Sequence, residues 1–425
     1  MLYGLADCNN FFVSCERVFR PDLRTKPVIV LSNNDGCAIS RSQEAKDLGI
    51  KMGQPLFEIM PIVEKYEVAV FSSNFALYGN LSNRVMSMLS HYTPHIEQYS
   101  IDEAFMDLTN VCKSDEEYRQ YGIEIVDMVK RATGIPISLG IAPTRTLAKM
   151  ASKYAKKYKG YRGSCLINSE ESRQKALKLF PIDDVFGIGR RYVKKLKQAG
   201  VNTAWDLTCK SADWVKNQMT ITGLRTWNEL QGYDCLQFDE LPMKKSITCS
   251  RSFADNGLTE LKALEGAIAT FTADVARKLR QQKSMCTQML VFAHTSLFVN
   301  SISQNFIQLQ INFSMPTSDT LLMTDMAVQA IRKAWVARDY KYKKAGVMVW
   351  NILPDNNIQT NLFEQRDYTK LNKLWQTIDA INRKSGSSLV KTAVQGKEQR
   401  EMMAQNHRSP EYTTNWNELW TINAT

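Results

Sequence analysis

Short apolar runs and longer amphipathic stretches occur through the first 160 residues of the chain. The short ones have the length of strands and are residues 2–7, residues 27–31, two runs within residues 96–108, and residues 137–141. The long ones are residues 115–132, which place Tyr118, Gly122, Ile125 and Val129 on one helical face, and about residues 146–157. Strands that alternate with helices predict a mixed α/β (α+β) domain.

The pattern changes after residue 180. Residues 181–232 are helical and basic, and a short segment with Pro and Lys at residues 241–245 has the composition of a linker. From there to residue 352 the pattern predicts strand, helix, strand, strand, helix, strand, which resembles a ferredoxin-like βαββαβ module. Its first helix has apolar residues at helical spacing, namely Leu264, Ile268, Phe271, Val275 and Leu279.

Residues 353–425 form a tail that follows the last predicted strand. One amphipathic helix is predicted on Leu371, Leu374, Ile378 and Ile381, and sequence rich in charged and amide residues follows it. This composition predicts a tether that carries short docking segments.

Charge and length narrow the class of protein. The chain has 425 residues, too many for one typical core, and a formal net charge of +11. The surplus of positive charge favours a polyanionic partner, either nucleic acid or an acidic membrane surface. The longest apolar runs have only strand length and the N-terminus has no basic leader, so we expect a soluble, cytoplasmic protein. Nine cysteines without a Cys-x-x-Cys pair favour reduced thiols over disulfides or zinc.

Three carboxylates lie at predicted strand ends. Asp7 ends the first strand, and Asp102 with Glu103 separates two others. Mg²⁺ prefers carboxylate oxygens and substrate phosphates, and two such ions ~4 Å apart stabilise an in-line phosphoryl displacement. Because successive strand residues point to opposite faces, Asp102 and Glu103 must occupy a turn or bulge if both are to reach metal ions. The alternative is that Asp7 caps a helix near Asn9 and that the acidic pair is simply a hairpin turn.

Spaced motifs in one order resemble those of the Y-family lesion-bypass DNA polymerases. They are Asp7-Cys8-Asn9-Asn10-Phe11-Phe12-Val13-Ser14-Cys15-Glu16, Ser32-Asn33-Asn34-Asp35-Gly36-Cys37, Glu44-Ala45-Lys46-Asp47-Leu48-Gly49-Ile50-Lys51-Met52-Gly53 and Tyr99-Ser100-Ile101-Asp102-Glu103-Ala104-Phe105. The second motif is similar to the branch that holds the catalytic subunit of bacterial DNA polymerase V. The likeness continues through Gly187-Ile188-Gly189-Arg190-Arg191 and Cys249-Ser250-Arg251-Ser252-Phe253, so it covers nearly the whole chain. It implies an error-prone, template-directed DNA polymerase that bypasses lesions in the DNA damage (SOS) response.

The resemblance also implies the roles of individual residues in the chemistry. By this resemblance, Asp7, Asp102 and Glu103 are catalytic residues that hold two Mg²⁺ ions. The backbone carbonyl of Cys8 completes the coordination shell of the metal. A deoxynucleoside triphosphate (dNTP) is then added to a primer 3′ hydroxyl, and pyrophosphate is released.

The incoming nucleotide has its own set of implied residues. They are Asn10, Phe11, Phe12, Ser40, Gln43, Lys46 and Lys156. Phe12 is implied as the steric gate, an aromatic ring beneath the sugar that leaves no room for a ribose 2′ hydroxyl. Gln43 departs from the tyrosine that is common in the family. Outside the motif context, the lysines could as well form a solvated helix face, and Phe11 and Phe12 could both be core residues.

Two basic regions are candidate DNA contacts. Gly187-Ile188-Gly189 resembles the hairpin of a helix-hairpin-helix, in which glycines let backbone N–H groups approach a phosphate, and Arg190 follows it. A left-handed turn without a ligand is the alternative. Arg251, with Lys278, Arg280 and Lys283, extends the basic track, for which a solvated face is the alternative.

Two tail segments resemble motifs that bind partners. Gln359-Thr360-Asn361-Leu362-Phe363 is similar to the peptide by which bacterial polymerases bind the sliding clamp, with Thr360 in place of the usual leucine. The alternative is that Leu362 and Phe363 fold back on the core. Ser409-Pro410-Glu411-Tyr412-Thr413-Thr414 is similar to the tail signature of the polymerase V branch. That branch implies a processed, UmuD-like regulatory dimer and the RecA filament as partners, besides primer-template DNA.

The implied architecture is a multidomain right hand. Its expected parts are a ferredoxin-like palm (residues 1–28 and 79–166), small fingers (29–78), a helical helix-hairpin-helix thumb (167–240), a βαββαβ little finger (241–352) and a partner-binding tail (353–425). One rival function is a nucleotide cyclase, which uses the same palm but needs neither the helix-hairpin-helix nor the clamp peptide. The other is a catalytically silent DNA-binding subunit that recruits other polymerases, and the three carboxylates argue against it.

Overall fold

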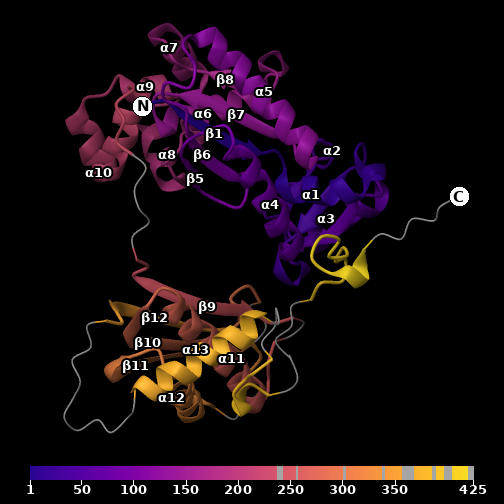
Figure 1. Ribbon diagram of the computed structural model, residues 1–425, viewed down its shortest axis with the longest axis vertical. Helices are drawn as coiled ribbons and strands as arrows, with labels where there is room; N and C mark the ends of the chain where they lie inside the picture. The colour runs from indigo at the N-terminus through magenta and orange to yellow at the C-terminus, as the bar shows by residue number, and fades with distance from the viewer. Residues whose placement is uncertain are drawn as a thin grey trace, which may run out of the picture. The chain divides into compact units, whose positions relative to one another are not determined.

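The structure is a computed structural model of the whole chain. It describes residues 1–236, 243–254, 257–299, 303–336, 340–356, 368–384, 389–396 and 404–419. The chain forms two compact units, Met1–Asp239 with Gln405–Thr425, and Glu240–Ala404 (Figure 1). The end of the chain therefore belongs to the first unit, although the second unit precedes it. None of the described helices is both long enough and apolar enough to cross a membrane.

A five-stranded sheet forms the centre of the first unit. Its order is β5-β6-β1-β7-β8, and the strands are β1 (Tyr3–Cys8), β5 (Ile96–Gln98), β6 (Glu103–Asp107), β7 (Ile137–Ala142) and β8 (Ser164–Leu166). Strand β1 lies in the interior and is antiparallel to both β6 and β7, while β8 is added parallel to β7. With a helix before β5 and another after β6, the first four strands make the ferredoxin-like arrangement predicted for the palm.

Alternate residues of β1 pack into two different cores. Ala6 and Cys8 join a core with helices α1 (Phe11–Phe19), α4 (Phe75–Leu89) and α5 (Asp115–Thr133). Tyr3 and Leu5 join the core beneath α6 (Arg145–Lys157). Asp7 has the parity of Tyr3 and Leu5, so it points to the face that α6 covers.

The fingers and the thumb complete the first unit. The fingers hold a sheet of order β3-β2-β4 with two short helices: β2 (Val28–Leu31), β3 (Ala38–Arg41), β4 (Ala69–Ser72), α2 (Gln43–Asp47) and α3 (Leu56–Lys65). The thumb is helical, as predicted, with α7 (Glu170–Leu179), α8 (Arg190–Gln198), α9 (Ala204–Thr208) and α10 (Ala212–Leu230). Short 3-10 turns are η1 (Pro21–Leu23), η2 (Asn33–Asp35), η3 (Lys159–Tyr161) and η4 (Ile182–Asp184).

The second unit has the predicted βαββαβ order of elements. They are β9 (Ser246–Ser252), α11 (Leu261–Gln281), β10 (Ser284–Thr295), β11 (Phe306–Thr317), α12 (Thr320–Ala334) and β12 (Tyr342–Pro354). The sheet order is β11-β10-β12-β9, so the ferredoxin-like strand order expected here is wrong. Strand β10 pairs with β11 on one side and along its whole length with β12 on the other, which leaves β9 the outer place beside β12.

The predicted tail helix is present as α13 (Tyr368–Lys384), and it packs on the second unit. The guanidinium of Arg280 donates to both carboxylate oxygens of Asp379 at 2.8 and 2.9 Å. The indole of Trp375 donates to Asp319 at 3.0 Å. This helix is therefore a folded part of the unit and not a free tether, and Arg280 holds it in place instead of extending the basic track.

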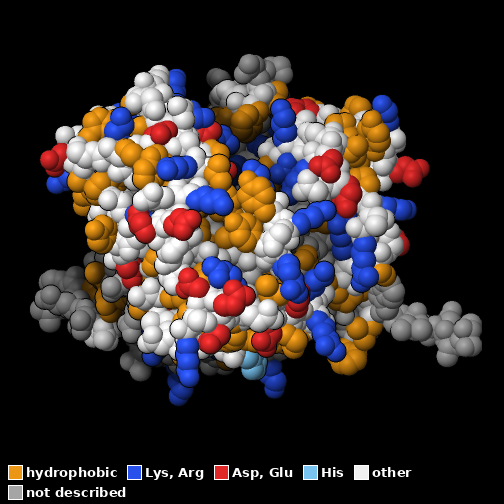
Figure 2. Space-filling model, turned by 90° about the horizontal axis from the view of Figure 1, so that it is seen from above, with side chains coloured by type: hydrophobic (Ala, Val, Ile, Leu, Met, Phe, Trp, Pro, Cys, Tyr) orange, Lys and Arg blue, Asp and Glu red, His pale blue; other side chains and the backbone are white. Residues whose placement is uncertain are grey.

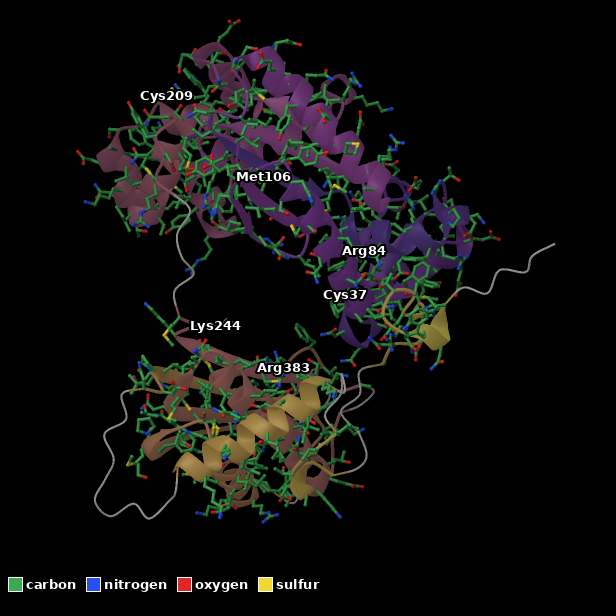
Figure 3. The ribbon with its side chains drawn as sticks, in the orientation of Figure 1. Cys37, Arg84, Met106, Cys209, Lys244 and Arg383 are labelled. Atoms are coloured by element: carbon green, nitrogen blue, oxygen red, sulfur yellow. The ribbon has the colours of Figure 1, made fainter. Side chains whose placement is uncertain are left out.

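The nine cysteines are free thiols, as the sequence predicts. Cys37 lies in the fingers and the exposed Cys209 lies in the thumb (Figure 3). The same view labels Met106 of β6, which is fully buried in the palm core.

Candidate active site

Two neighbouring strands bring the predicted acidic residues to one place. Asp7 of β1 and Glu103 of β6 are directly opposite each other in antiparallel register. The backbone N–H of Cys8 donates to the carbonyl oxygen of Asp102 at 2.8 Å. Asp7 and Glu103 both point to the face of the sheet that α6 covers. Alternate strand residues point to the same face, and each acid alternates with a residue of the core beneath that helix; for Asp7 this residue is Leu5.

Asp102 lies in a bend immediately before β6. Ser100 holds this bend, because its hydroxyl oxygen accepts from the N–H groups of Asp102 and Glu103 at 3.2 and 3.0 Å. The Ser100 hydroxyl in turn donates to Oδ1 of Asp102 at 2.5 Å. Asp102 therefore lies in a turn, as predicted. Its side chain need not point to the face opposite that of Glu103, as it would in a regular strand.

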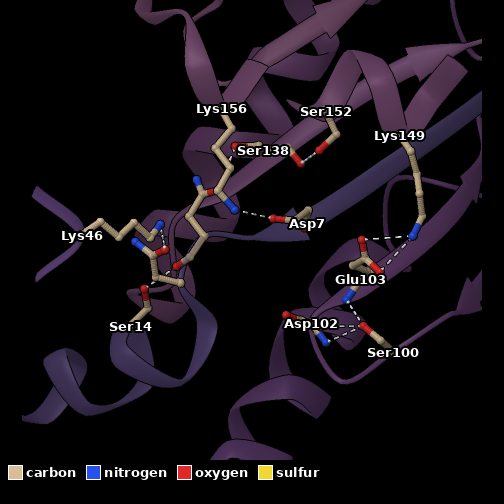
Figure 4. Close-up of polar contacts among 12 residues, drawn as sticks. Asp7, Ser14, Lys46, Ser100, Asp102, Glu103, Ser138, Lys149, Ser152 and Lys156 are labelled. Atoms are coloured by element: carbon tan, nitrogen blue, oxygen red, sulfur yellow. Dashed lines mark hydrogen bonds and ion pairs between the residues drawn. The ribbon is translucent and has the colours of Figure 1, made fainter. Parts of the chain in front are cut away.

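Two lysines of α6 bind the opposed carboxylates (Figure 4). Lys156 donates to Asp7 at 3.0 Å, and Lys149 donates to the two oxygens of Glu103 at 3.3 and 3.2 Å. Burial raises the pKa of Glu103, and the ammonium group of Lys149 opposes that rise. Lys149 was not predicted as a site residue; its separation of seven residues from Lys156, which puts both on one helix face, is the signal that could have found it.

The acidic residues suit magnesium by their donor chemistry. Asp7, Asp102, Glu103 and the Cys8 carbonyl offer only oxygen atoms, the ligands that Mg²⁺ prefers. Across the described ranges, no three His, Cys, Asp or Glu residues are close enough together to form a metal-binding group. The carboxylates of Asp7 and Glu103 face ammonium groups instead, so metal binding requires them to exchange lysine for the metal ion.

A pocket of about 230 Å³ opens beside Asp7 and Asp102. Its lining includes the predicted nucleotide-binding residues Asn10, Phe11, Phe12, Ser40, Lys46 and Lys156. Gln43 is not among the lining residues, because its amide turns along α2 and donates to Asp47 at 2.8 Å. Arg41 lines the pocket as well and was not predicted.

Three basic side chains face this pocket: Arg41, Lys46 and Lys156. Lys46 donates to Oδ1 of Asn10 at 2.6 Å. Burial lowers the pKa of Lys46, and the charges of Lys156 and Arg41 lower it further. Cations that repel one another in this way are stabilised when a polyphosphate lies between them.

The adjacent rings of Phe11 and Phe12 have different surroundings. Phe11 is 3% exposed, whereas Phe12 is half-buried and stacks on Tyr78, with ring centroids 4.7 Å apart and an interplanar angle of 18°. Asn10 precedes α1 as its N-cap residue, so Asp7 does not cap this helix. Both rings line the pocket, but Phe11 is a buried member of the core and Phe12 is only partly buried against it. The role of Phe12 as a gate stays a prediction.

The predicted DNA contacts lie in both units. Gly187 has a φ of +85°, and a Cβ there would lie 2.7 Å from the hydroxyl of Thr226, so the turn requires glycine. Ile188 is buried, and Gly189 is the N-cap residue of α8, where Arg190 is exposed. Arg251 is half-buried on β9 of the second unit. On the face drawn in Figure 2, Lys and Arg side chains gather in the right-hand half.

The residues expected to form the clamp peptide, Gln359, Leu362 and Phe363, lie outside the described residues.

Comparisons with known proteins decide the family. The model of the impB/mucB/samB family matches residues 6–153, and that of the family's C-terminal domain matches residues 244–362. Protein UmuC of Salmonella typhimurium is 38% identical over 425 residues, which cover 99% of this chain and 100% of the relative. The chain belongs to the impB/mucB/samB family.

Other relatives of this impB/mucB/samB family member are DNA polymerases. DNA polymerase IV of Clostridium acetobutylicum is 25% identical over 378 residues, 88% of this chain and 91% of the relative. A Y-family DNA polymerase chimera of Dbh and Dpo4 superimposes with a TM-score of 0.63 at 22% identity, covering 83% of this chain and 100% of the chimera. The fold is therefore that of the Y-family polymerases, and the resemblance found in the sequence is confirmed. A domain of unknown function matches residues 372–422.

Proposed function

We propose that this impB/mucB/samB family member is a template-directed DNA polymerase that extends a primer past DNA lesions. The observation that carries the proposal is that Asp7, Asp102 and Glu103 lie at the same end of two neighbouring palm strands, and that Asp7 and Asp102 line a pocket together with basic side chains. Acids and cations in this arrangement are what transfer of a nucleotide from its triphosphate needs.

Each part of the site has a separate task in this reaction. Asp7, Asp102, Glu103 and the Cys8 carbonyl would hold two magnesium ions, which when bound lower the pKa of the primer hydroxyl and offset charge on the leaving phosphate. Lys46 and Lys156 bind the triphosphate oxygens. These two lysines thereby stabilise the pyrophosphate that leaves.

Selection of the nucleotide sugar and binding of the DNA duplex are assigned to different residues. Phe12 lies beneath the sugar of the incoming nucleotide and excludes a ribose. The loop from Gly187 to Gly189 leads into α8, whose first backbone N–H groups bind a DNA phosphate, and the exposed Arg190 adds charge. Contacts of this kind ignore sequence and weaken as salt rises, which suits an enzyme that copies any template.

Partners are proposed on the family signatures alone. They are the sliding clamp, a processed UmuD-like dimer and the RecA filament. Leu362→Ala with Phe363→Ala should leave basal extension unchanged and remove stimulation by the clamp. Unchanged clamp affinity in this double variant would place the docking segment elsewhere.

Primer extension by the purified protein tests the proposed function. The reaction contains magnesium and either an undamaged or an abasic template. Extension on both templates is the expected result. DNA binding without extension would support the silent recruiting subunit, and a cyclic nucleotide formed without a primer would support the cyclase.

A further inference from the structure

The last described segment of the first unit, residues 405–419, packs on the palm and fingers. Figure 1 shows it in yellow against the indigo and violet elements around α1 and α3. The N–H of Ser72 donates to the carbonyl of His407 at 3.0 Å, and the N–H of His407 donates to the Ser72 hydroxyl at 2.9 Å. The N–H of Asn406 donates to the carboxylate of Asp35 at 2.8 Å. The segment is thus paired with the fingers through its own backbone.

Asn74 ties the same segment to the start of α4. Its Oδ1 accepts from the N–H of Leu77 and caps the helix. Its Nδ2 donates to the carbonyl of Ser409 at 3.0 Å, to the Ser409 hydroxyl at 3.1 Å and to the carbonyl of Pro410 at 3.2 Å. One side chain therefore fixes both the helix and the docked segment.

Ser409 connects this docking to the aromatic ring in the pocket. Its hydroxyl donates to Oε1 of Glu16 at 3.0 Å, and the hydroxyl of Tyr78 donates to the same oxygen at 2.6 Å. Glu16 and Tyr78 are fully buried, and the ring of Tyr78 stacks on Phe12. An unbroken series of contacts runs from Ser409 through Glu16 and Tyr78 to Phe12.

The two hydroxyl donors hold Glu16 jointly. A buried carboxylate must be hydrogen-bonded to stay in place, and the other oxygen, Oε2, has no hydrogen-bond partner among the described residues. If the Ser409 hydroxyl is removed, Glu16 keeps only the donor from Tyr78. Glu16 can then shift, and the hydroxyl of Tyr78 no longer donates to an acceptor with a fixed position, so the Tyr78 ring is held less firmly.

We propose that Ser409 is a positioning residue for Phe12, acting through Glu16 and Tyr78, and that it thereby takes part in the choice between deoxyribonucleotides and ribonucleotides. The inference rests on the proposed function, in which Phe12 lies beneath the sugar. It also assigns a role to part of the domain of unknown function that matches residues 372–422: its α13 packs on the second unit, whereas its residues after 404 complete the first.

Hydrogen exchange of the full-length protein tests the docking without any activity. In the wild type, the amides of Ser72 and His407 should exchange slowly, because both are hydrogen-bonded between the two segments. Ser409→Ala should speed exchange at both amides. Thr414→Ala removes an exposed hydroxyl of the same segment and is the matched control, which should exchange like the wild type.

Single-nucleotide insertion with matched deoxyribo- and ribonucleoside triphosphates tests the positioning. Ser409→Ala should lower the deoxyribose preference roughly threefold to tenfold, the effect of one buried hydrogen bond. The kcat for the deoxynucleotide should stay near that of the wild type. In a Phe12→Ala background the same change should have no further effect, because the ring it positions is gone.

Three results would overturn the inference. The first is a wild-type preference in Ser409→Ala although exchange shows that the segment has loosened. The second is unchanged exchange in Ser409→Ala, and the third is the same loss of preference with and without Phe12. A wild-type protein that extends no primer overturns the proposed function and with it the role in sugar choice, whereas hydrogen exchange still decides the docking.

Discussion

Asp7 and Glu103 face each other across strands β1 and β6, yet their carboxylates bind different lysines of the same helix. Lys156 and Lys149 are two turns apart on α6, so they reach two points of one sheet end. Each lysine neutralises one acid of the site. In the proposed reaction, the metal ions would bind the acids of these ion pairs. The triphosphate would bind Lys156.

Lys156 is expected to bind the triphosphate once Asp7 binds metal. Lys156→Ala should therefore raise the KM for the incoming deoxynucleotide about tenfold, with a smaller effect on kcat. Steady-state single-nucleotide insertion measures both constants. Lys157→Ala is the control, because Lys157 is the exposed neighbour that lies over the ring of Tyr158. Equal KM values in the two variants would remove Lys156 from the nucleotide site.

Phe12 and Phe11 are expected to respond differently to truncation. Phe12→Ala should raise ribonucleotide incorporation roughly tenfold or more, since relief of overpacking is worth about 1 to 3 kcal/mol, while deoxynucleotide addition survives. Phe11→Ala should lower the free energy of unfolding by about 3 to 5 kcal/mol, because Phe11 is a core ring. Insertion ratios and denaturant unfolding measure the two effects. A Phe12 variant with the wild-type ratio would show that this ring is only packing.

Glu16 is expected to make the first unit less stable as pH rises. Burial raises its pKa from 4.5 to about 7, although the hydroxyls of Tyr78 and Ser409 and the charge of Arg20 oppose the rise. Between these two values the native protein binds a proton that the unfolded chain releases, so the free energy of unfolding falls with increasing pH. The loss is on the order of 3 kcal/mol and is complete above about pH 7.

Glu16→Gln separates the pH dependence caused by Glu16 from that of the other titratable groups. The amide oxygen still accepts from both hydroxyls, but it does not titrate in this range. Denaturant unfolding at pH 5 and pH 8 should show a smaller difference in the variant than in the wild type. An equal difference would assign the pH dependence to another group.

The palm and the acidic site could be predicted because their signals are local. The short apolar run of residues 2–7 gives β1, and Asp102 next to Glu103 requires the bend that Ser100 holds. The order of the motifs along the chain then indicates a polymerase, which the spacing of the acidic residues alone does not decide.

The docking of the C-terminal segment could not be predicted in this way. Asn74 and Ser409 are polar residues 335 positions apart, and a polar side chain that binds a distant segment looks like a solvated one in the sequence. The pairing of Arg280 with Asp379 was missed for the same reason, since a basic residue on a helix is more often exposed. Contacts between distant polar groups have no periodicity to reveal them.

Asp102→Asn tests the assignment of the acidic site most directly. The amide keeps the volume of the side chain and an oxygen that accepts from the Ser100 hydroxyl, and no lysine ion pair is broken, as it would be in an Asp7 variant. Single-turnover insertion of the correct deoxynucleotide, with magnesium and a bound primer-template, is the measurement. We expect the folded variant to bind DNA like the wild type and to insert nucleotides at least about a thousandfold more slowly, because a metal-binding charge is lost. Insertion near the wild-type rate by that variant would contradict the two-metal account.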